Sequence, residues 1–386
     1  MHNILIGLDG GATKVSAWQI EQTLKGFVLG SIHSEKTYSS FPPFNPEFTP
    51  VDIQTQLEEI NSSIALTDSE QKQGQAFIHA FTDTISELSS DEEIIIGIGM
   101  PGIKTTDGRG IAAMANGPRI PKFCDELEKA LSENSIKLAK PIHHLGSDAD
   151  YCGLGEEYAD TGLFKSVENA YYLGGGTGAA DALKLEGNLI SLDETKSWLL
   201  KSWEMKNNDN IPLEHYASSG GIQSIYSTYS CKSISSLNRD KIFPNIILDL
   251  ADQGDEAATE TFSDISFYLA ELLFERIETI YSGWEGRFGF VNPNRETPSS
   301  QHPFIGTTLD RIIIGQRLGT LLESSEGLGI FWEPFVYHLT QLINESYHIN
   351  SIAKSAYLNN KQLIQISTLR DAPALGAGID AVSDGL

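Results

Sequence analysis

Residues 171–181 read Tyr-Tyr-Leu-Gly-Gly-Gly-Thr-Gly-Ala-Ala-Asp. An apolar strand enters a turn rich in glycine, and apolar residues resume at Ala182. Glycines let a ligand approach the backbone closely, so the exposed N–H groups and the Thr177 hydroxyl would form a concave donor surface suited to phosphate. A glycine-rich hairpin that binds nothing is the alternative, and this turn alone does not decide between them.

A similar turn lies near the start of the chain. Residues 4–8 predict a buried strand, residues 9–14 read Asp-Gly-Gly-Ala-Thr-Lys, and an apolar/polar alternation resumes from Val15. The pattern predicts a second hairpin with backbone donors at its tip. It is not a Walker loop, because the spacing differs, and no helix pattern follows as in a dinucleotide fingerprint. Asp9, beside Thr13 and Lys14, suits a water-mediated contact to Mg²⁺ next to phosphates; an acidic turn residue is the alternative.

Composition narrows the class of protein. The 386 residues suffice for two domains, and no apolar run reaches the length of a membrane span. A net charge of −25 repels phosphodiester backbones, so a nucleic-acid partner is not expected. No secretory signal is visible. The three cysteines are odd in number and far apart, which indicates free thiols in a reducing compartment and a cytoplasmic location: Cys124, Cys152 and Cys231.

Buried strands alternate with amphipathic helices along the chain. Fully apolar strands between helices predict a sheet covered on both faces. We expect strands at 94–99, 311–319 and 364–367, and helices at 74–88, 123–132, 262–281, 331–345 and 372–382. Residues 32–60 include four prolines and predict a loop. This loop is either pinned to the body by its phenylalanines or a lid, and the pinned loop is the simpler interpretation.

Asp148 follows a strand-like segment and precedes a helix expected over residues 151–158. An aspartate at such a junction lies at the carboxyl edge of the sheet, where α/β proteins bind ligands. It could accept a proton from a hydroxyl group, or Ser147 or Asp148 could simply cap the helix. The adjacent His143-His144 pair has no third ligand at suitable spacing, so we assign it to structure.

These pieces together resemble the actin-like ATPase and sugar-kinase superfamily, and within it the ROK family of sugar kinases. The similar segments occur in the family's order over nearly the whole chain: residues 7–14 (first phosphate motif), 97–102 (G-x-G-x-P-G), 147–156 (N-D-A…A-L-G-E), 173–178 (second phosphate motif), 213–218 (C-L-E-x-x-A-S) and 314–316 (adenosine-side turn).

The resemblance implies an α/β fold of two actin-like (ribonuclease-H-like) lobes with a nucleotide/sugar cleft between them. The first lobe would span residues 1–120 plus the C-terminal helix 371–386, and the second residues 121–370. The implied activity is ATP-dependent phosphorylation of a hydroxyl on a hexose or N-acetylhexosamine, with Mg²⁺. The resemblance is also compatible with a homodimer.

The resemblance also implies roles for individual residues. Asp148 would be the general base, and Asp9 would contact Mg²⁺ through water. Asn116, Ser147, Asp148 and Glu214 would bind the sugar. ATP would be bound, mainly through its phosphates, by Asp9, Gly11, Thr13, Lys14, Gly175, Gly176, Thr177 and Gly178, and on the adenosine side by Gly315.

The sequence departs from the family pattern in several places. The zinc motif is absent between Leu189 and Leu213, so no zinc is expected. The E-x-G-H sugar-contact segment is not recognisable near Glu204, Ser147 replaces an asparagine, and Gln316 stands where a second glycine is typical. A non-catalytic sugar- or nucleotide-sensing regulatory relative is therefore the rival. The first strand begins close to Met1, which leaves no room there for the helix-turn-helix of the family's repressors.

Overall fold

The computed structural model describes residues 3–60, 64–326 and 329–383. Its internal contacts divide the chain into two compact units, Met1–Gly162 with Asp371–Leu386 (unit 1) and Leu163–Arg370 (unit 2). Unit 1 therefore ends at Gly162, whereas the sequence places the end of the first lobe near residue 120. The reason is that the segment after residue 120 supplies an edge strand to the first sheet and two helices that pack on the helices covering it.

Unit 1 is built on a five-stranded mixed sheet in the order β3-β2-β1-β4-β7. Strands β1, β2 and β3 form an antiparallel meander, while β1, β4 and β7 run parallel. The bounds are β1 Ile4–Gly10, β2 Lys14–Gln22, β3 Phe27–Thr37, β4 Ile94–Gly99 and β7 Leu145–Gly146.

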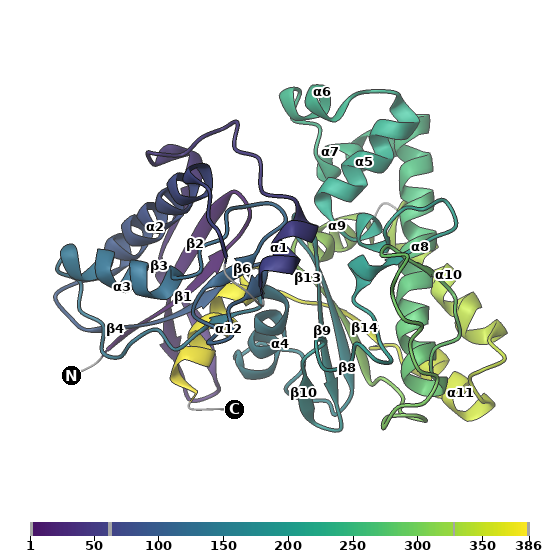
Figure 1. Ribbon diagram of the computed structural model, residues 1–386. Coiled ribbons are helices and arrows are strands. Elements are labelled where there is room, and N and C mark those ends of the chain that lie inside the picture. The colour runs from purple at the N-terminus through teal and green to yellow at the C-terminus, as the bar shows by residue number, and fades with distance from the viewer. Residues whose placement is uncertain (1–2, 61–63, 327–328, 384–386) are drawn as a thin grey trace. The chain divides into compact units, whose positions relative to one another are not determined.

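Both faces of this sheet carry helices (Figure 1). Helices α2 (Asp68–Leu88) and α3 (Phe123–Glu133) pack against the buried strand residues of one face. Helix α12 (Ala372–Val382) covers the other and packs on α4 (Asp148–Tyr158). A Cβ on Gly7 would lie 1.8 Å from the Ala374 carbonyl oxygen, so α12 contacts the strand backbone directly. This contact explains why the end of the chain belongs to unit 1.

Unit 2 repeats the plan of unit 1. Its sheet has the order β10-β9-β8-β13-β14, again with one antiparallel meander and one parallel half. The similarity of the two glycine hairpins thus reflects an internal duplication of the sheet. The bounds are β8 Ala170–Gly175, β9 Ala179–Leu185, β10 Asn188–Ile190, β13 Arg311–Gly315 and β14 Ile364–Ile366.

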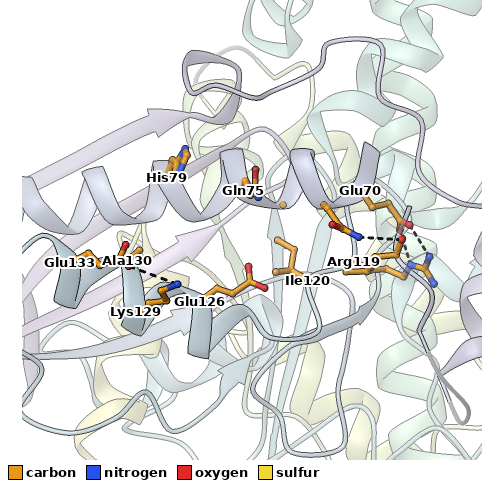
Figure 2. A pocket seen from close by; sticks show the side chains of 12 residues that line it. Glu70, Gln75, His79, Arg119, Ile120, Glu126, Lys129, Ala130 and Glu133 are labelled. Atoms are coloured by element: carbon orange, nitrogen blue, oxygen red, sulfur yellow. Dashed lines mark hydrogen bonds and ion pairs between the residues drawn. The ribbon is translucent and has the colours of Figure 1, made fainter. Parts of the chain in front are cut away.

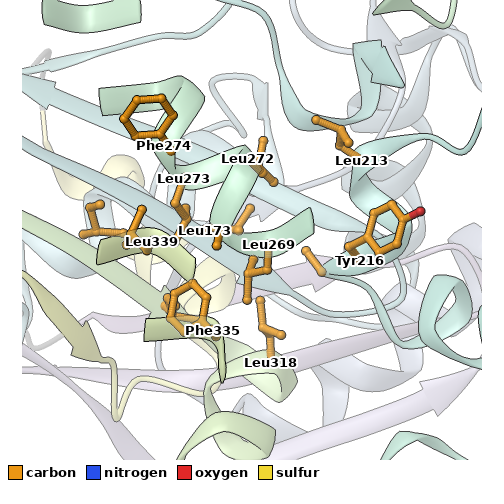
Figure 3. Packing of buried hydrophobic residues seen from close by; sticks show 14 of the residues in the cluster. Leu173, Leu213, Tyr216, Leu269, Leu272, Leu273, Phe274, Leu318, Phe335 and Leu339 are labelled. Carbon is orange, nitrogen blue, oxygen red and sulfur yellow. The ribbon is translucent and has the colours of Figure 1, made fainter. Parts of the chain in front are cut away.

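The core of unit 2 is centred on the long helix α8, Glu256–Ser282. Figure 3 shows its Leu269, Leu272 and Leu273 packed against Leu173 of β8 and Phe335 of α10. Helices α5 (Ser219–Ser230), α7 (Pro244–Asp252) and α10 (Trp332–Glu345) contact α8. The remaining helices are α6 Ile234–Arg239, α9 Gln316–Glu326 and α11 Ser351–Asn359.

Two sequence predictions need correction. The segment 32–60 is not one loop, because β3 continues to Thr37 and residues Ile53–Glu59 form helix α1. The strand predicted at 311–319 ends at Gly315, and α9 begins at Gln316, which has a positive φ of 56°. That left-handed residue turns the backbone out of the strand and into the helix. No helix in the described ranges is long and apolar enough to cross a membrane.

Candidate functional site

The ends of three parallel strands bring Asp9 and Asp148 to one edge of the unit 1 sheet. Asp9 of β1 lies beside Gly99 of β4, which in turn lies beside Gly146 of β7. Neighbouring strands are about 4.8 Å apart, so Asp9 and Gly146 are separated by roughly 10 Å. Asp148 follows Gly146 by two residues and is the first residue of α4. The carboxyl edge predicted from the sequence therefore carries both acidic residues.

The charge around Asp9 is unbalanced. Burial, together with the neighbouring carboxylates of Asp148 and Asp371, raises the pKa of Asp9 to about 7, while Lys14 opposes the shift. Lys14 is itself ion-paired with Glu35, so its charge is shared. Burial also raises the pKa of Asp371. A site where two carboxylates lie close to a third one that is largely buried favours a bound cation.

Asp371 was not among the residues predicted from the sequence. It directly precedes α12 and belongs to unit 1, although it is separated from Asp9 by all of unit 2 in the chain. An acidic residue before a predicted helix was the only local signal, and that position is common for helix caps. The Asp371 side chain makes no hydrogen bond that caps α12, but it accepts a hydrogen bond from the Trp18 side chain.

The tip of the first hairpin is held by Tyr38, a residue that sequence reasoning also missed. The Gly11 N–H donates to the Lys14 carbonyl oxygen at 2.9 Å and closes the turn. The Tyr38 hydroxyl donates to the Gly11 carbonyl at 3.1 Å, and the Tyr38 N–H donates to the Thr13 carbonyl at 3.1 Å. Tyr38 is buried and stacks on Phe77. The hairpin therefore has a fixed shape, which a phosphate-binding turn requires.

Thr13 and Asn116 line a common pocket in unit 1. The pocket has a volume of about 420 Å³, and the proline-bearing segment 44–50 forms another of its walls. Asn116 is exposed in the turn after β6 (Ile111–Ala113). The structure thus brings a predicted sugar residue and a predicted phosphate residue together, whereas Ser147 and Asp148 are not among the residues that line this pocket.

The second hairpin, residues 175–178, joins β8 to β9. The Gly176 N–H donates to the Gly178 carbonyl at 2.8 Å, and the Gly176 carbonyl accepts from the N–H of Ser219, at the start of α5, at 2.9 Å. Thr177 and Gly178 are exposed, as a donor surface requires. A Cβ on Gly175 would lie 1.9 Å from the Ala217 carbonyl oxygen, so Gly175 is needed for packing.

Glu214 lies against this second hairpin in unit 2. Its carboxylate accepts a hydrogen bond from the Ala179 N–H, and a Cβ on Gly178 would lie 3.6 Å from its Oε2. Burial raises the pKa of Glu214. The structure therefore gives this glutamate a direct part in fixing the hairpin.

Gly315 and Gln316 also adjoin the second hairpin. Gln316 forms an isolated parallel bridge with Gly175. A Cβ on Gly315 would lie 2.3 Å from the Tyr172 hydroxyl, so only glycine fits there. The predicted adenosine-side turn and the second phosphate turn are thus neighbours within unit 2.

The other titratable clusters near the site are structural. His144 pairs with Asp380 of α12 at 3.0 Å, and Asp380 also accepts from the Tyr151 hydroxyl at 2.8 Å. This pairing raises the pKa of His144, while His144 and Tyr151 lower that of Asp380. Within the described residues, no group of three or more His, Cys, Asp or Glu side chains has an arrangement that could hold a metal ion.

A further pocket in unit 1 lies along α2 and α3, with a volume of about 550 Å³ (Figure 2). Its charged residues are largely paired with one another. The buried Arg119 donates from Nε to Glu70 at 2.7 Å and is also ion-paired with Glu59. Burial raises the pKa of Glu126, which faces this pocket. Arg119 therefore ties α1 to α2, and this pocket is separate from the hairpin.

Solved structures with the same fold cover nearly the whole chain. A ROK family glucokinase from Streptomyces griseus, in complex with glucose and AMPPNP, matches with a TM-score of 0.59 at 12% identity, covering 99% of this chain and 100% of that one. A putative sugar kinase from Cytophaga hutchinsonii matches with a TM-score of 0.56 at 18% identity, covering 97% and 98%. The chain has the ROK-kinase fold. The predicted α/β architecture of two actin-like lobes is thereby confirmed.

The ROK-kinase fold is not restricted to enzymes. A ROK family transcriptional regulator, a homologue of the E. coli MLC protein, matches with a TM-score of 0.54 at 11% identity, covering 98% of this chain and 78% of that one. No family profile and no curated protein matches the sequence. At these identities the likeness establishes the fold alone.

Proposed function

We propose that the protein is an ATP-dependent sugar kinase that transfers the γ-phosphoryl group to a sugar hydroxyl. The observation that carries the proposal is the alignment of Asp9 and Asp148 at the carboxyl edge of the unit 1 sheet, next to a braced hairpin. Phosphoryl transfer needs mainly positioning and neutralisation of charge, together with a group that accepts the hydroxyl proton. These residues offer each of those functions.

Asp148 would accept the proton of the sugar hydroxyl as its oxygen bonds to the γ-phosphorus and the bond to the ADP oxygen breaks. Its position at the start of α4 leaves the carboxylate half-buried, and the only hydrogen bond it makes within the described structure is with the Ala149 N–H. Ser147 and Asn116 would bind other hydroxyls of the sugar. Glu214 would act there as well, or instead hold the second hairpin in shape.

The residues around Asp9 fit a magnesium ion held through water. Asp148 and Asp371 raise the pKa of Asp9, and a divalent cation would offset the negative charge of these side chains. Mg²⁺ keeps several waters and is bound by one or two carboxylates plus phosphates, so a cluster of direct protein ligands is not required. When bound, it would neutralise charge on the transferring phosphates. Thr13, Lys14, the backbone at Gly176 and the exposed Thr177 and Gly178 would hold those phosphates.

A sensor that binds sugar or nucleotide without turnover is the second candidate. The observation that favours it is the side chain of Gln316, which lies against the second hairpin where the phosphates would approach. The two candidates differ in one measurable property, the release of ADP.

A coupled ADP-release assay over hexoses, N-acetylhexosamines and pentoses tests the proposal. We expect sugar-dependent ADP release with at least one of them, and loss of that release in Asp148→Asn. If no sugar or other hydroxyl acceptor supports release, while sugar or nucleotide still binds, the sensor is the correct assignment.

A further inference from the structure

The pocket that joins Thr13 to Asn116 has an unusual lining. In a chain with 20% charged residues, none of the described residues that line this pocket is charged. Its walls carry phenylalanine and proline side chains, among them Phe44, Phe48 and Pro118, and its polar groups are hydroxyls and amides. The volume of about 420 Å³ lies in the range where small molecules bind, roughly 300–1,000 Å³. Such a lining suits an uncharged group with an apolar part.

The wall formed by residues 44–50 is held in place by buried glutamines. The Gln73 side chain of α2 accepts a hydrogen bond from the Asn45 N–H at 2.9 Å. Gln56 of α1 donates to the Val51 carbonyl at 2.7 Å and exchanges hydrogen bonds with the backbone of Met114, two residues before Asn116. Gln56 is fully buried, and Gln73 is nearly so. Both ends of the segment are therefore anchored.

Aromatic packing adds to this anchoring. Phe44 packs against the core of unit 1, and Phe77 lies beneath the pocket and stacks on Tyr38. The segment is thus a fixed wall, in agreement with the pinned loop favoured from the sequence. A preformed wall lowers the entropy cost of binding, because little of the pocket has to become ordered.

We infer that this pocket is a subsite for an apolar substituent of a neutral sugar, and that it selects N-acyl sugars over the parent hexoses. The inference rests on the proposed kinase function, because Thr13 of the phosphate hairpin lines the same pocket. The acyl methyl group would contact Phe44 and Phe48. The amide groups of Asn45 and Asn116 would offer hydrogen bonds to the acyl amide. A protonated amino sugar finds no counter-charge among the lining residues.

Binding measured without nucleotide tests this subsite independently of catalysis. Calorimetric titration would compare a hexose, its 2-amino derivative and its N-acetyl derivative, with N-propionyl and N-butanoyl forms as a length series. We expect the N-acetyl sugar to bind the wild-type protein at least tenfold more tightly than the hexose, and the charged amino sugar to bind most weakly.

Two variants change the pocket without touching the acidic edge. Phe48→Ala should remove most of the preference for the N-acyl sugar, and Ala115→Asp should weaken its binding at least tenfold by placing a charge in the pocket. Gln75→Glu adds a charge on the exposed side of α2, and Phe243→Ala removes an exposed phenylalanine in unit 2; both should bind like wild type. Circular dichroism and melting temperature establish that each variant is folded.

The outcomes separate this inference from the proposed function. Equal affinity for hexose and N-acyl sugar, no sugar binding at all, or a preference that survives Phe48→Ala in a folded protein would each overturn the subsite. An N-acyl preference that Phe48→Ala abolishes, without ADP release from any acceptor, would leave the subsite standing and overturn the kinase. Turnover of hexoses with no preference for N-acyl sugars would support the kinase and overturn the subsite.

Discussion

The side-chain oxygen of Gln316 lies 2.9 Å from the point where a side chain on Gly176 would begin. Gln316 also has a left-handed backbone, with φ of 56°, which costs a residue with a side chain on the order of 1–2 kcal/mol. The sequence has glutamine where the resembled family has glycine, and the structure shows that glycine would be the unstrained residue there.

Two replacements of Gln316 should therefore distinguish the effect of its strained backbone from the effect of its side chain, which covers Gly176. Gln316→Gly should raise the free energy of unfolding by roughly 0.5–1 kcal/mol, because the gain exceeds the added flexibility of the unfolded chain. Gln316→Ala keeps the strain and should not stabilise. Both should bind an ATP analogue more tightly, as measured by titration, since both uncover Gly176. Equal stability of the two variants would contradict the strain argument.

Asp148→Asn distinguishes catalysis from helix capping. The N-cap of α4 is Ser147, and Asp148 accepts only from the adjacent Ala149 N–H, a bond that asparagine can also make. We expect a melting temperature close to that of wild type, unchanged nucleotide affinity, and turnover lowered by roughly a hundredfold or more. Wild-type turnover on the preferred sugar would show that Asp148 is not the base.

The pKa of Asp9 predicts a specific dependence of stability on pH. The folded protein holds the Asp9 proton up to about pH 7, whereas the unfolded chain releases it near 3.8. Between these values the folded state binds more protons, so the contribution of Asp9 to the free energy of unfolding falls as the pH rises. Over this whole range the loss is on the order of 4 kcal/mol.

Asp9→Asn removes this titration. The free energy of unfolding of Asp9→Asn should exceed that of wild type only slightly at pH 5. The difference should grow by up to about 3 kcal/mol at pH 8, as measured by urea unfolding at both pH values. Lys14→Gln serves as a comparison, because it removes the opposing charge and should lower stability at pH 8. A stability gap between Asp9→Asn and wild type that does not change with pH would contradict the burial argument.

The two glycines at the second hairpin should respond differently to substitution. Gly176→Val meets only the end of the flexible Gln316 side chain, so the fold should persist while ATP binding is lost. Gly175→Ala would place a Cβ 1.9 Å from the Ala217 carbonyl oxygen and 2.6 Å from the Leu318 Cβ, so it should lower the melting temperature markedly. Unchanged nucleotide affinity in Gly176→Val would count against the phosphate assignment.

Zinc should be absent from the purified protein. Cys124 and Cys152 are buried, Cys231 is exposed, and the segment 189–213 contains neither cysteine nor histidine. Elemental analysis of protein prepared without chelators checks this expectation. One zinc per chain would mean that the histidines near Asp380 bind a metal as well as forming an ion pair.

The features predicted well from the sequence are those with a local cause. The apolar run of β4, the glycine hairpins and the bounds of α12 follow from residue patterns within a few positions. Asp371 and Tyr38 could not be assigned to the site this way, because tertiary packing brings them to the first hairpin. The strand predicted through Gly319 failed for a related reason: the run of isoleucines gives no sign that Gln316 takes a left-handed backbone.

The contact of α12 with β1 has a consequence for synthesis of the protein. β1 leaves the ribosome before unit 2, but the helix that covers one face of its sheet follows all of unit 2 in the chain. Unit 2 can therefore become compact while the nascent unit 1 still exposes the sheet surface around Gly7 and Gly97, to which α12 will bind. Exposed sheet surface of this kind is prone to aggregation. During translation, this surface of unit 1 stays uncovered until α12 has been synthesised.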